Sequence, residues 1–185
     1  MNIRIEKDFF FQSAVHFENK FYINSYEVSL SMLVETESMR EQHVAMDRIT
    51  HFIEEVLQNS ILVNSKDTSS IKKYSKAGIR VCELPEQPYD QIVSMILLLK
   101  LNAIMEGRIK VTDMIMGSLM SEGVKYNTVS EVAEGAFSGN TWWNKSCTCM
   151  KNHEENTSDD NIVRLRQRLM FSVQKLAIFI LFEFL

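Results

Sequence analysis

The amino-acid sequence predicts an α+β fold in which an antiparallel sheet carries two helices on one face. Residues 2–17 and 22–35 alternate between apolar and polar side chains with a period of two, which is typical of strands. Residues 41–57 and 89–105 instead repeat apolar side chains at helical spacing. Two more strand-like stretches follow the second helix, so strands occur in pairs and do not alternate singly with helices.

The first two strands are predicted to pair as an antiparallel hairpin, because only residues 18–21 connect them. One face of the first strand is apolar, and the other includes Gln12 and His16. The second strand places one apolar set on a single face: Tyr26, Val28, Leu30, Met32 and Val34. His16 is the only histidine of this hairpin, whereas a zinc site needs about three protein ligands.

The first helix, residues 41–57, has an apolar stripe and a charged face, and Ser38 is a candidate for its N-cap. His43 and His51 fall on one side of this helix, where a solvated face explains them better than a metal site. The following residues, 58–78, are polar and mixed.

A helical turn is expected at residues 70–76, where Gly78 stops it, and residues 79–84 are expected to form a short strand. The second helix, residues 89–105, is almost wholly apolar but is interrupted by polar residues. A membrane span needs about 20 predominantly apolar residues, so we expect burial within the protein or an assembly. Two predicted strands, at residues 108–116 and 123–129, complete the order of elements along the chain.

Composition excludes some classes of function. The net charge of −4 argues against general nucleic-acid binding, which needs a basic surface. Three cysteines give no disulfide framework, and together with the absence of a signal-peptide hydrophobic region they predict a cytoplasmic protein.

The expected domain covers residues 1–133, followed by a polar loop or disordered linker at 134–161 and a basic-apolar, helical segment at 162–185. That last segment is expected to dock on the body or on another subunit, and membrane-surface contact is the less favoured alternative. In the linker, Trp142–Trp143 is expected to pack or to stack on a ligand. A Cys/His tract in the linker offers three possible zinc ligands, one fewer than the four of a structural zinc site: Cys147, Cys149 and His153.

Four local phrases carry a resemblance to a known family: KDFFFQSAVHF, FYINSYEVSL, LQNSILVN and QPYDQ. Together with the order of elements over about residues 3–127, the chain resembles the tunnelling-fold (T-fold) proteins of the 6-pyruvoyltetrahydropterin synthase and 6-carboxytetrahydropterin synthase group. The resemblance implies a T-fold-like antiparallel sheet of ββααββ order, a homo-oligomer and a small heterocyclic ligand. It also implies a zinc ion held by three histidines.

The sequence departs from this family at the positions that carry its chemistry. The family's His-x-His pair corresponds to residues 23–25, which are Ile, Asn and Ser and are poor zinc ligands. Its acid/base pair corresponds to Gln58 and Asn59, which do not titrate usefully. The ring-anchoring glutamate falls near Ser118, and Cys82 lies on the wrong element to be the nearby nucleophile. We therefore expect neither a zinc site nor another cofactor.

Five residues are the candidates for a surviving ligand site: His16, Gln12, Gln91, Asp90 and Asp113. Gln91 corresponds to a second ring-binding carboxylate and keeps hydrogen-bonding capacity. Asp113 marks a site if it is buried, and otherwise faces solvent or a subunit edge.

Two hypotheses for function follow. The first is a degenerate or repurposed T-fold protein that binds a ligand or builds an assembly. The alternative is a pterin- or purine-type lyase or synthase that uses a non-standard residue set, with His16, Asp113 and Gln91 in the pocket. Whether the chain is an enzyme is left open at this point.

Overall fold

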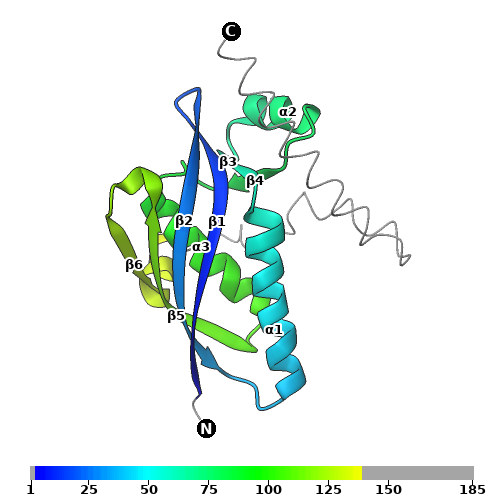
Figure 1. Cartoon of the computed structure of the whole chain (residues 1–185), viewed down its shortest axis with the longest axis vertical. Helices are drawn as coiled ribbons and strands as arrows, with labels where there is room; N and C mark the ends of the chain where they lie inside the picture. The colour runs from blue at the N-terminus through cyan, green and yellow to red at the C-terminus, as the bar shows by residue number, and fades with distance from the viewer. Residues whose placement is uncertain (1–2, 139–185) are drawn as a thin grey trace, which may run out of the picture.

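A six-stranded sheet organises the computed structural model, which describes residues 3–138 (Figure 1). The strand order is β4-β3-β1-β2-β5-β6. Strands β1 (Arg4–Phe17) and β2 (Lys20–Val34) are the two longest and lie at the centre. They pair antiparallel over their whole length, and the turn between them places Glu18 and Asn19 at φ 51° and 62°. Positive φ at both central residues is the geometry that a tight hairpin prefers, so the predicted hairpin is confirmed.

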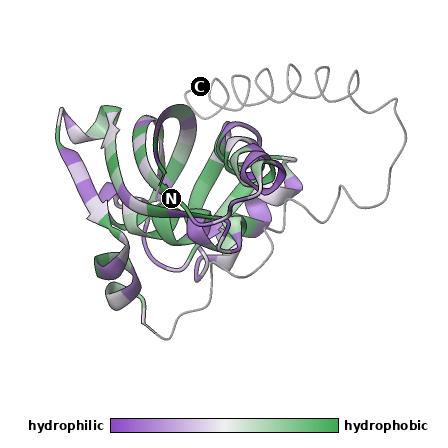
Figure 2. Cartoon of the chain, turned by 90° about the horizontal axis from the view of Figure 1, so that it is seen from below, coloured by the Kyte–Doolittle hydropathy of each residue, from purple (hydrophilic) through white to green (hydrophobic). Residues whose placement is uncertain are grey.

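Two helices cover one face of the sheet. Helix α1 (Met39–His51) continues into a π-helical segment, η1 (Phe52–Leu57), and α3 (Asp90–Met105) lies beside it. The predicted cap is confirmed, because the Ser38 side chain accepts a hydrogen bond from the backbone N–H of Glu41. The main core forms between these helices and the strands, and includes Val28, Leu30, Ile53 and Leu98. Figure 2 shows hydrophobic and hydrophilic residues alternating along the strands, as a sheet with one covered face requires.

The other face is covered at one end only. Strands β3 (Ser60–Asn64) and β4 (Val81–Leu84) extend the sheet beyond β1 and run parallel to it, so the sheet is mixed and not wholly antiparallel as expected. Helix α2 (Thr68–Lys76) connects them, and its Tyr74 packs with Ala14, Ile61 and Val63 in a second, smaller core. Leu62, between the last two, belongs to the main core. Because side chains alternate across a strand, α2 lies on the opposite face, in addition to the two helices that the sequence predicts on one face.

The last strand pair lies on the other side of β2. Strand β5 (Ile109–Ser118) pairs with β2 and with β6 (Lys125–Val129), and a 3-10 turn, η2 (Leu119–Ser121), joins them. A short helix that the sequence did not predict, α4 (Ser130–Ala136), follows and buries Ala133 against the core. Residues 139–185, which include Trp142–Trp143, the Cys/His tract and the predicted C-terminal helix, lie outside the described residues. Within residues 3–138, none of the helices has the length and apolar character needed to cross a membrane.

Leu98→Ala is predicted to lower the free energy of unfolding by about 2–5 kcal/mol, because Leu98 is fully buried between α3 and the sheet and its truncation leaves a cavity. The matched control is Leu119→Ala, since Leu119 is 73% exposed and its truncation should cost less than about 0.5 kcal/mol. Chemical denaturation of both variants measures the difference. Equal losses in the two variants would contradict this assignment of the core.

Candidate functional site

A pocket of about 510 Å³ lies where β1, β2 and β5 meet the β5–β6 turn. Its lining comes from β1, β2, β5, the start of β6, the residue after η1 and the β5–β6 turn: Phe10, Phe11, Gln12, Ser25, Tyr26, Glu27, Gln58, Gly117, Ser118, Leu119, Gly123, Val124 and Lys125. The size falls within the range of small-molecule sites, and the lining is mostly apolar with a few polar groups. This pocket is therefore the candidate binding site of the described chain.

The strand register explains why these residues meet. Gln12 pairs with Ser25, and one row further along Phe10 pairs with Glu27. Glu27 pairs in turn with Gly117, which pairs with Lys125. Residues paired directly across a sheet project on the same side, so this row crosses four strands on one face. Glu27 and Lys125 form an ion pair at 3.4 Å above the bare backbone of Gly117.

Two glutamines form one wall of the pocket. The backbone N–H of Gln12 donates to Gln58 Oε1 at 2.8 Å, and the backbone N–H of Asn59 donates to the Gln12 carbonyl at 2.7 Å. Asn59 has φ 57°, a left-handed conformation that asparagine tolerates better than most residues, and it lies where η1 ends and β3 begins. The chain reversal at Asn59 thus fixes the Gln58 side chain against β1. Gln12 and Gln58 place their side-chain amides beside the pocket, where they can donate or accept hydrogen bonds but cannot carry a proton at neutral pH.

Behind the pocket lies a polar cluster that links three elements. The Ser118 hydroxyl donates to one carboxylate oxygen of Asp90, the first residue of α3. The buried Asn24 side chain donates to the other oxygen at 3.4 Å, and its own carbonyl accepts from the backbone N–H of Met120 at 3.1 Å. These contacts hold the β5–β6 turn, which lines the pocket, against β2 and the start of α3.

Tyr26 adjoins this cluster and also lines the pocket. Its ring stacks on Phe11 with centroids 4.8 Å apart, and its hydroxyl has no hydrogen-bond partner of good geometry among residues 3–138. Burial, together with the neighbouring charge of Asp90, raises the pKa of Tyr26 well above its usual range. The phenol therefore stays neutral and can serve as a hydrogen-bond donor or acceptor, but not as a base.

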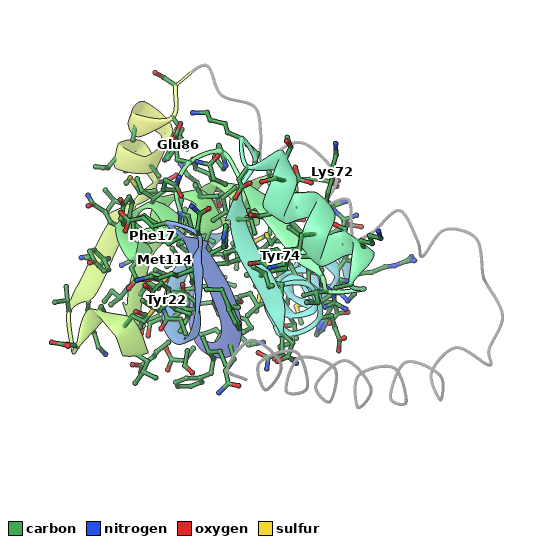
Figure 3. All side chains as sticks on the ribbon, turned by 90° about the horizontal axis from the view of Figure 1, so that it is seen from above. Phe17, Tyr22, Lys72, Tyr74, Glu86 and Met114 are labelled. Atoms are coloured by element: carbon green, nitrogen blue, oxygen red, sulfur yellow. The ribbon has the colours of Figure 1, made fainter. Side chains whose placement is uncertain are left out.

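His16 lies away from the pocket, at the end of β1 that α2 covers. Its Nδ1 is 3.2 Å from the Asp67 carboxylate, and its ring lies edge to face with that of Tyr74, with the two centroids 5.6 Å apart. Tyr74, on α2, is labelled in Figure 3. His16 pairs with Phe21, two residues from the positions where the resemblance places the zinc-binding pair. Among residues 3–138 there is no group of three or more His, Cys, Asp and Glu side chains that could hold a metal ion.

The other predicted site residues are spread over the molecule. Gln12 lines the pocket, and Asp90 lies behind it through Ser118. Gln91 is exposed on the first turn of α3 and does not line the pocket. Asp113 pairs with Arg4 at 3.6 Å, two rows further along the sheet, with its side chain 38% exposed. Of the five, Gln12 lines the pocket and Asp90 contacts the pocket residue Ser118, and a ligand-binding role for any of them stays a prediction.

Sequence reasoning did not identify Phe10, Glu27, Gly117 or Lys125 as site residues. They are far apart in the chain, and only the strand register brings them into one row. The available signal was the glycine itself, because a glycine inside a strand often marks a bulge or a close approach of another molecule.

Comparisons with known proteins found similarity in structure. No protein-family model matches this chain, and no curated protein matches its sequence. An uncharacterized protein from Wolinella succinogenes is similar in structure, with a TM-score of 0.50, 11% identity and coverage of 70% of this chain and 98% of that one. The structure of 6-pyruvoyl tetrahydropterin synthase from Plasmodium vivax gives a TM-score of 0.46 at 10% identity, covering 69% and 97% of the two chains. The Plasmodium falciparum synthase gives 0.43 at 9%, covering 69% and 96%.

The chain has the α+β, T-fold-like architecture that its sequence predicts: a long central hairpin, helices on its inner face, and a second strand pair beside it. At these levels of identity the likeness concerns the fold alone.

The Asp67 carboxylate is predicted to make stability depend on pH in the acid range. Hydrogen bonds from the side chain and backbone N–H of Ser70 lower the pKa of Asp67 from 3.8 to about 2. A folded-state pKa below the unfolded value contributes stability above about pH 4, and that contribution is lost as the pH falls toward 2. Asp67→Asn keeps an oxygen that can cap α2 but has no carboxylate to protonate.

The wild type should therefore lose about 1–2 kcal/mol more stability than Asp67→Asn between pH 5 and pH 2. Urea denaturation at a series of pH values measures this difference. Asp47→Asn, at an exposed position on α1, is the matched control and should follow the wild type. Parallel curves for the wild type and Asp67→Asn would contradict the prediction.

Proposed function

We propose that this chain is a T-fold protein repurposed to bind a small heterocyclic molecule, without the zinc-dependent chemistry that the resemblance implies. One observation carries the proposal. Three positions that the resemblance assigns to zinc binding, proton transfer and ring anchoring are Ser25, Gln58 and Ser118, and all three line the same pocket. At these positions the described chain carries two hydroxyls and an amide, and the Ser118 hydroxyl bonds Asp90 behind the pocket.

The chemistry of these groups supports binding over catalysis. Serine hydroxyls and glutamine amides are poor zinc ligands, and neither carries a proton to or from a substrate at neutral pH. They do supply hydrogen-bond donors and acceptors, which orient a ligand in a mostly apolar pocket. The two charged lining residues, Glu27 and Lys125, pair with each other. The alternative of a pterin- or purine-type enzyme needs a proton carrier, and the ionisable side chains among the lining residues are this ion pair and the Tyr26 phenol.

Assembly into a homo-oligomer is part of the same proposal. Strands β4 and β6 are the edges of the described sheet, and an uncovered edge presents unpaired backbone groups that favour pairing with another chain. Exposed apolar residues near the β6 edge, Leu119, Met120 and Val124, add to this tendency. A cytoplasmic location, a tail docked on the body and the absence of nucleic-acid binding also remain proposals.

The test of the proposed function combines elemental analysis, native mass and a ligand titration. Neopterin, guanine and hypoxanthine are uncharged heterocycles, and each is titrated into the full chain while amide shifts are followed by NMR. We expect shifts at Gln12, Ser25, Gln58 and Ser118 with at least one probe, and no stoichiometric zinc. About one zinc per subunit, or probe-induced shifts confined to other surfaces, would overturn the proposal.

Gln58→Ala is predicted to weaken binding of the responding heterocycle about 3- to 10-fold, because one side-chain hydrogen bond contributes about 1 kcal/mol. Gln87→Ala is the matched control, since Gln87 is exposed and lies away from the pocket lining. Isothermal titration calorimetry of the two variants measures the difference. Equal affinities in the two variants would show that the Gln58 side chain does not contribute to binding.

A further inference from the structure

We propose that the pocket selects ligands that present a hydrogen-bond acceptor, a carbonyl oxygen or an unprotonated ring nitrogen, and that the side-chain NH2 group of Gln58 is the donor that reads it. This inference rests on the proposed function, because it specifies which chemical group the same pocket recognises. It assigns a specificity-determining role to Gln58 and a positioning role to the backbone N–H of Gln12.

The first step is that the backbone around Gln58 is held in place. The carbonyl of the preceding residue, Leu57, accepts hydrogen bonds from two buried hydroxyls, Ser13 Oγ at 2.9 Å and Ser60 Oγ at 2.7 Å. The Gln58 N–H donates to the Ile53 carbonyl, five residues back, at 3.1 Å, which is the hydrogen-bond pattern of the π-helical segment η1. The residue that follows Gln58 is bonded to β1. The Gln58 side chain therefore starts from a fixed point between η1 and β3.

The second step is that the Gln58 amide has one orientation. Its Oε1 accepts a hydrogen bond from the backbone N–H of Gln12 at 2.8 Å. A backbone N–H only donates, so the amide atom that faces it must be the oxygen and not the nitrogen. Exchanging the two atoms would set the NH2 group against another donor and would lose this bond. The carbonyl end of the amide is therefore used by β1. The Nε2 end is left for a ligand, since Gln58 lines the pocket and is only half-buried.

The third step is that two other donors of the lining are directed at protein acceptors. The Ser118 hydroxyl donates to Asp90, and the Lys125 ammonium group lies 3.4 Å from the Glu27 carboxylate. The Nε2 group of Gln58 instead faces a mostly apolar lining. A ligand that displaces water from this donor without offering an acceptor leaves it unpaired, which lowers affinity. The fixed amide thus favours acceptors over donors at this end of the pocket.

The first measurement tests the orientation of the amide without a ligand. Hydrogen exchange of the Gln12 amide is followed by NMR in the full chain for the wild type, Gln58→Glu and Gln58→Ala. Glutamate keeps an oxygen that can accept from Gln12, so the first two should exchange alike. Gln58→Ala should exchange about 3- to 10-fold faster, because it removes the acceptor. Equal exchange in all three would show that Gln12 does not hold Gln58, and would overturn the inference whatever the pocket binds.

The second measurement compares two bicyclic aromatic probes that are uncharged at neutral pH. Quinoline has a ring nitrogen that accepts a hydrogen bond, and indole has a ring N–H that donates one. Each probe is titrated into the full chain while amide shifts are followed by NMR. We expect the wild type to bind quinoline about 3- to 10-fold more tightly than indole, because only quinoline pairs with Nε2. Both probes should shift Gln12 and Gln58.

Gln58→Glu is expected to reverse this preference, because a carboxylate accepts from the indole N–H and cannot donate to quinoline. A reversal is not produced by general loss of structure, which would weaken both probes together. Gln58→Ala has neither group and should bind the two probes with similar affinity. The matched control is Gln87→Glu, which makes the same change of charge at an exposed residue away from the lining and should keep the wild-type preference.

The remaining outcomes separate this inference from the proposed function. If both probes shift pocket residues but Gln58→Glu keeps the wild-type preference, or if the wild type prefers indole, Gln58 does not select acceptors and the proposed function stands. If neither these probes nor neopterin, guanine and hypoxanthine shift any pocket residue of the wild type, the proposed function fails and this inference fails with it.

Discussion

The backbone pairing of β1 with β2 runs without interruption from Arg4 opposite Leu33 to Phe17 opposite Lys20, and the rest of the described chain is built on it. Strand β3 joins the outer edge of β1, and β5 joins the outer edge of β2. The two faces of the hairpin differ, with Phe9, Phe11 and Val28 in the main core and Phe10 and Glu27 on the other side. A slip of one residue would exchange these faces, so burial of the apolar set fixes the register, and the register fixes which residues line the pocket.

The features with strong periodicity were predictable from the sequence alone. The hairpin, the helix capped by Ser38 and the buried helix α3 all follow from alternation or helical spacing over long stretches. Strand β3 was missed because all five of its residues are buried, so SILVN shows no alternation. The partner of His16 was missed for another reason: Asp67 lies in a polar stretch far along the chain, and only the parallel pairing of β3 with β1 brings the residues that follow β3 beside His16.

The candidate site was predictable only in part, because it depends on register. The family resemblance indicated Gln58 and the neighbourhood of Ser118 as altered positions, and both residues line one pocket. The resemblance could not indicate Glu27 and Lys125, which lie almost a hundred residues apart in the chain. Their side chains meet because β5 pairs with β2 on one side and with β6 on the other. Asp113 illustrates the converse case, since an aspartate among apolar neighbours of a strand turned out to pair with Arg4 at the surface.

The features around the pocket that lower stability argue that the pocket is more than a by-product of the fold. The Tyr26 hydroxyl is buried without a partner among the described residues, which costs about 1–3 kcal/mol. Asn24 and Asp90 form a cluster behind the pocket where apolar side chains would pack, and Gly117 weakens its strand. Phe10 leaves an aromatic ring in solvent. Tyr26 belongs to the main core and also lines the pocket, Phe10 and Gly117 line it, and Asn24 and Asp90 lie behind it, so these costs gather in one part of the sheet and support a binding role for that region.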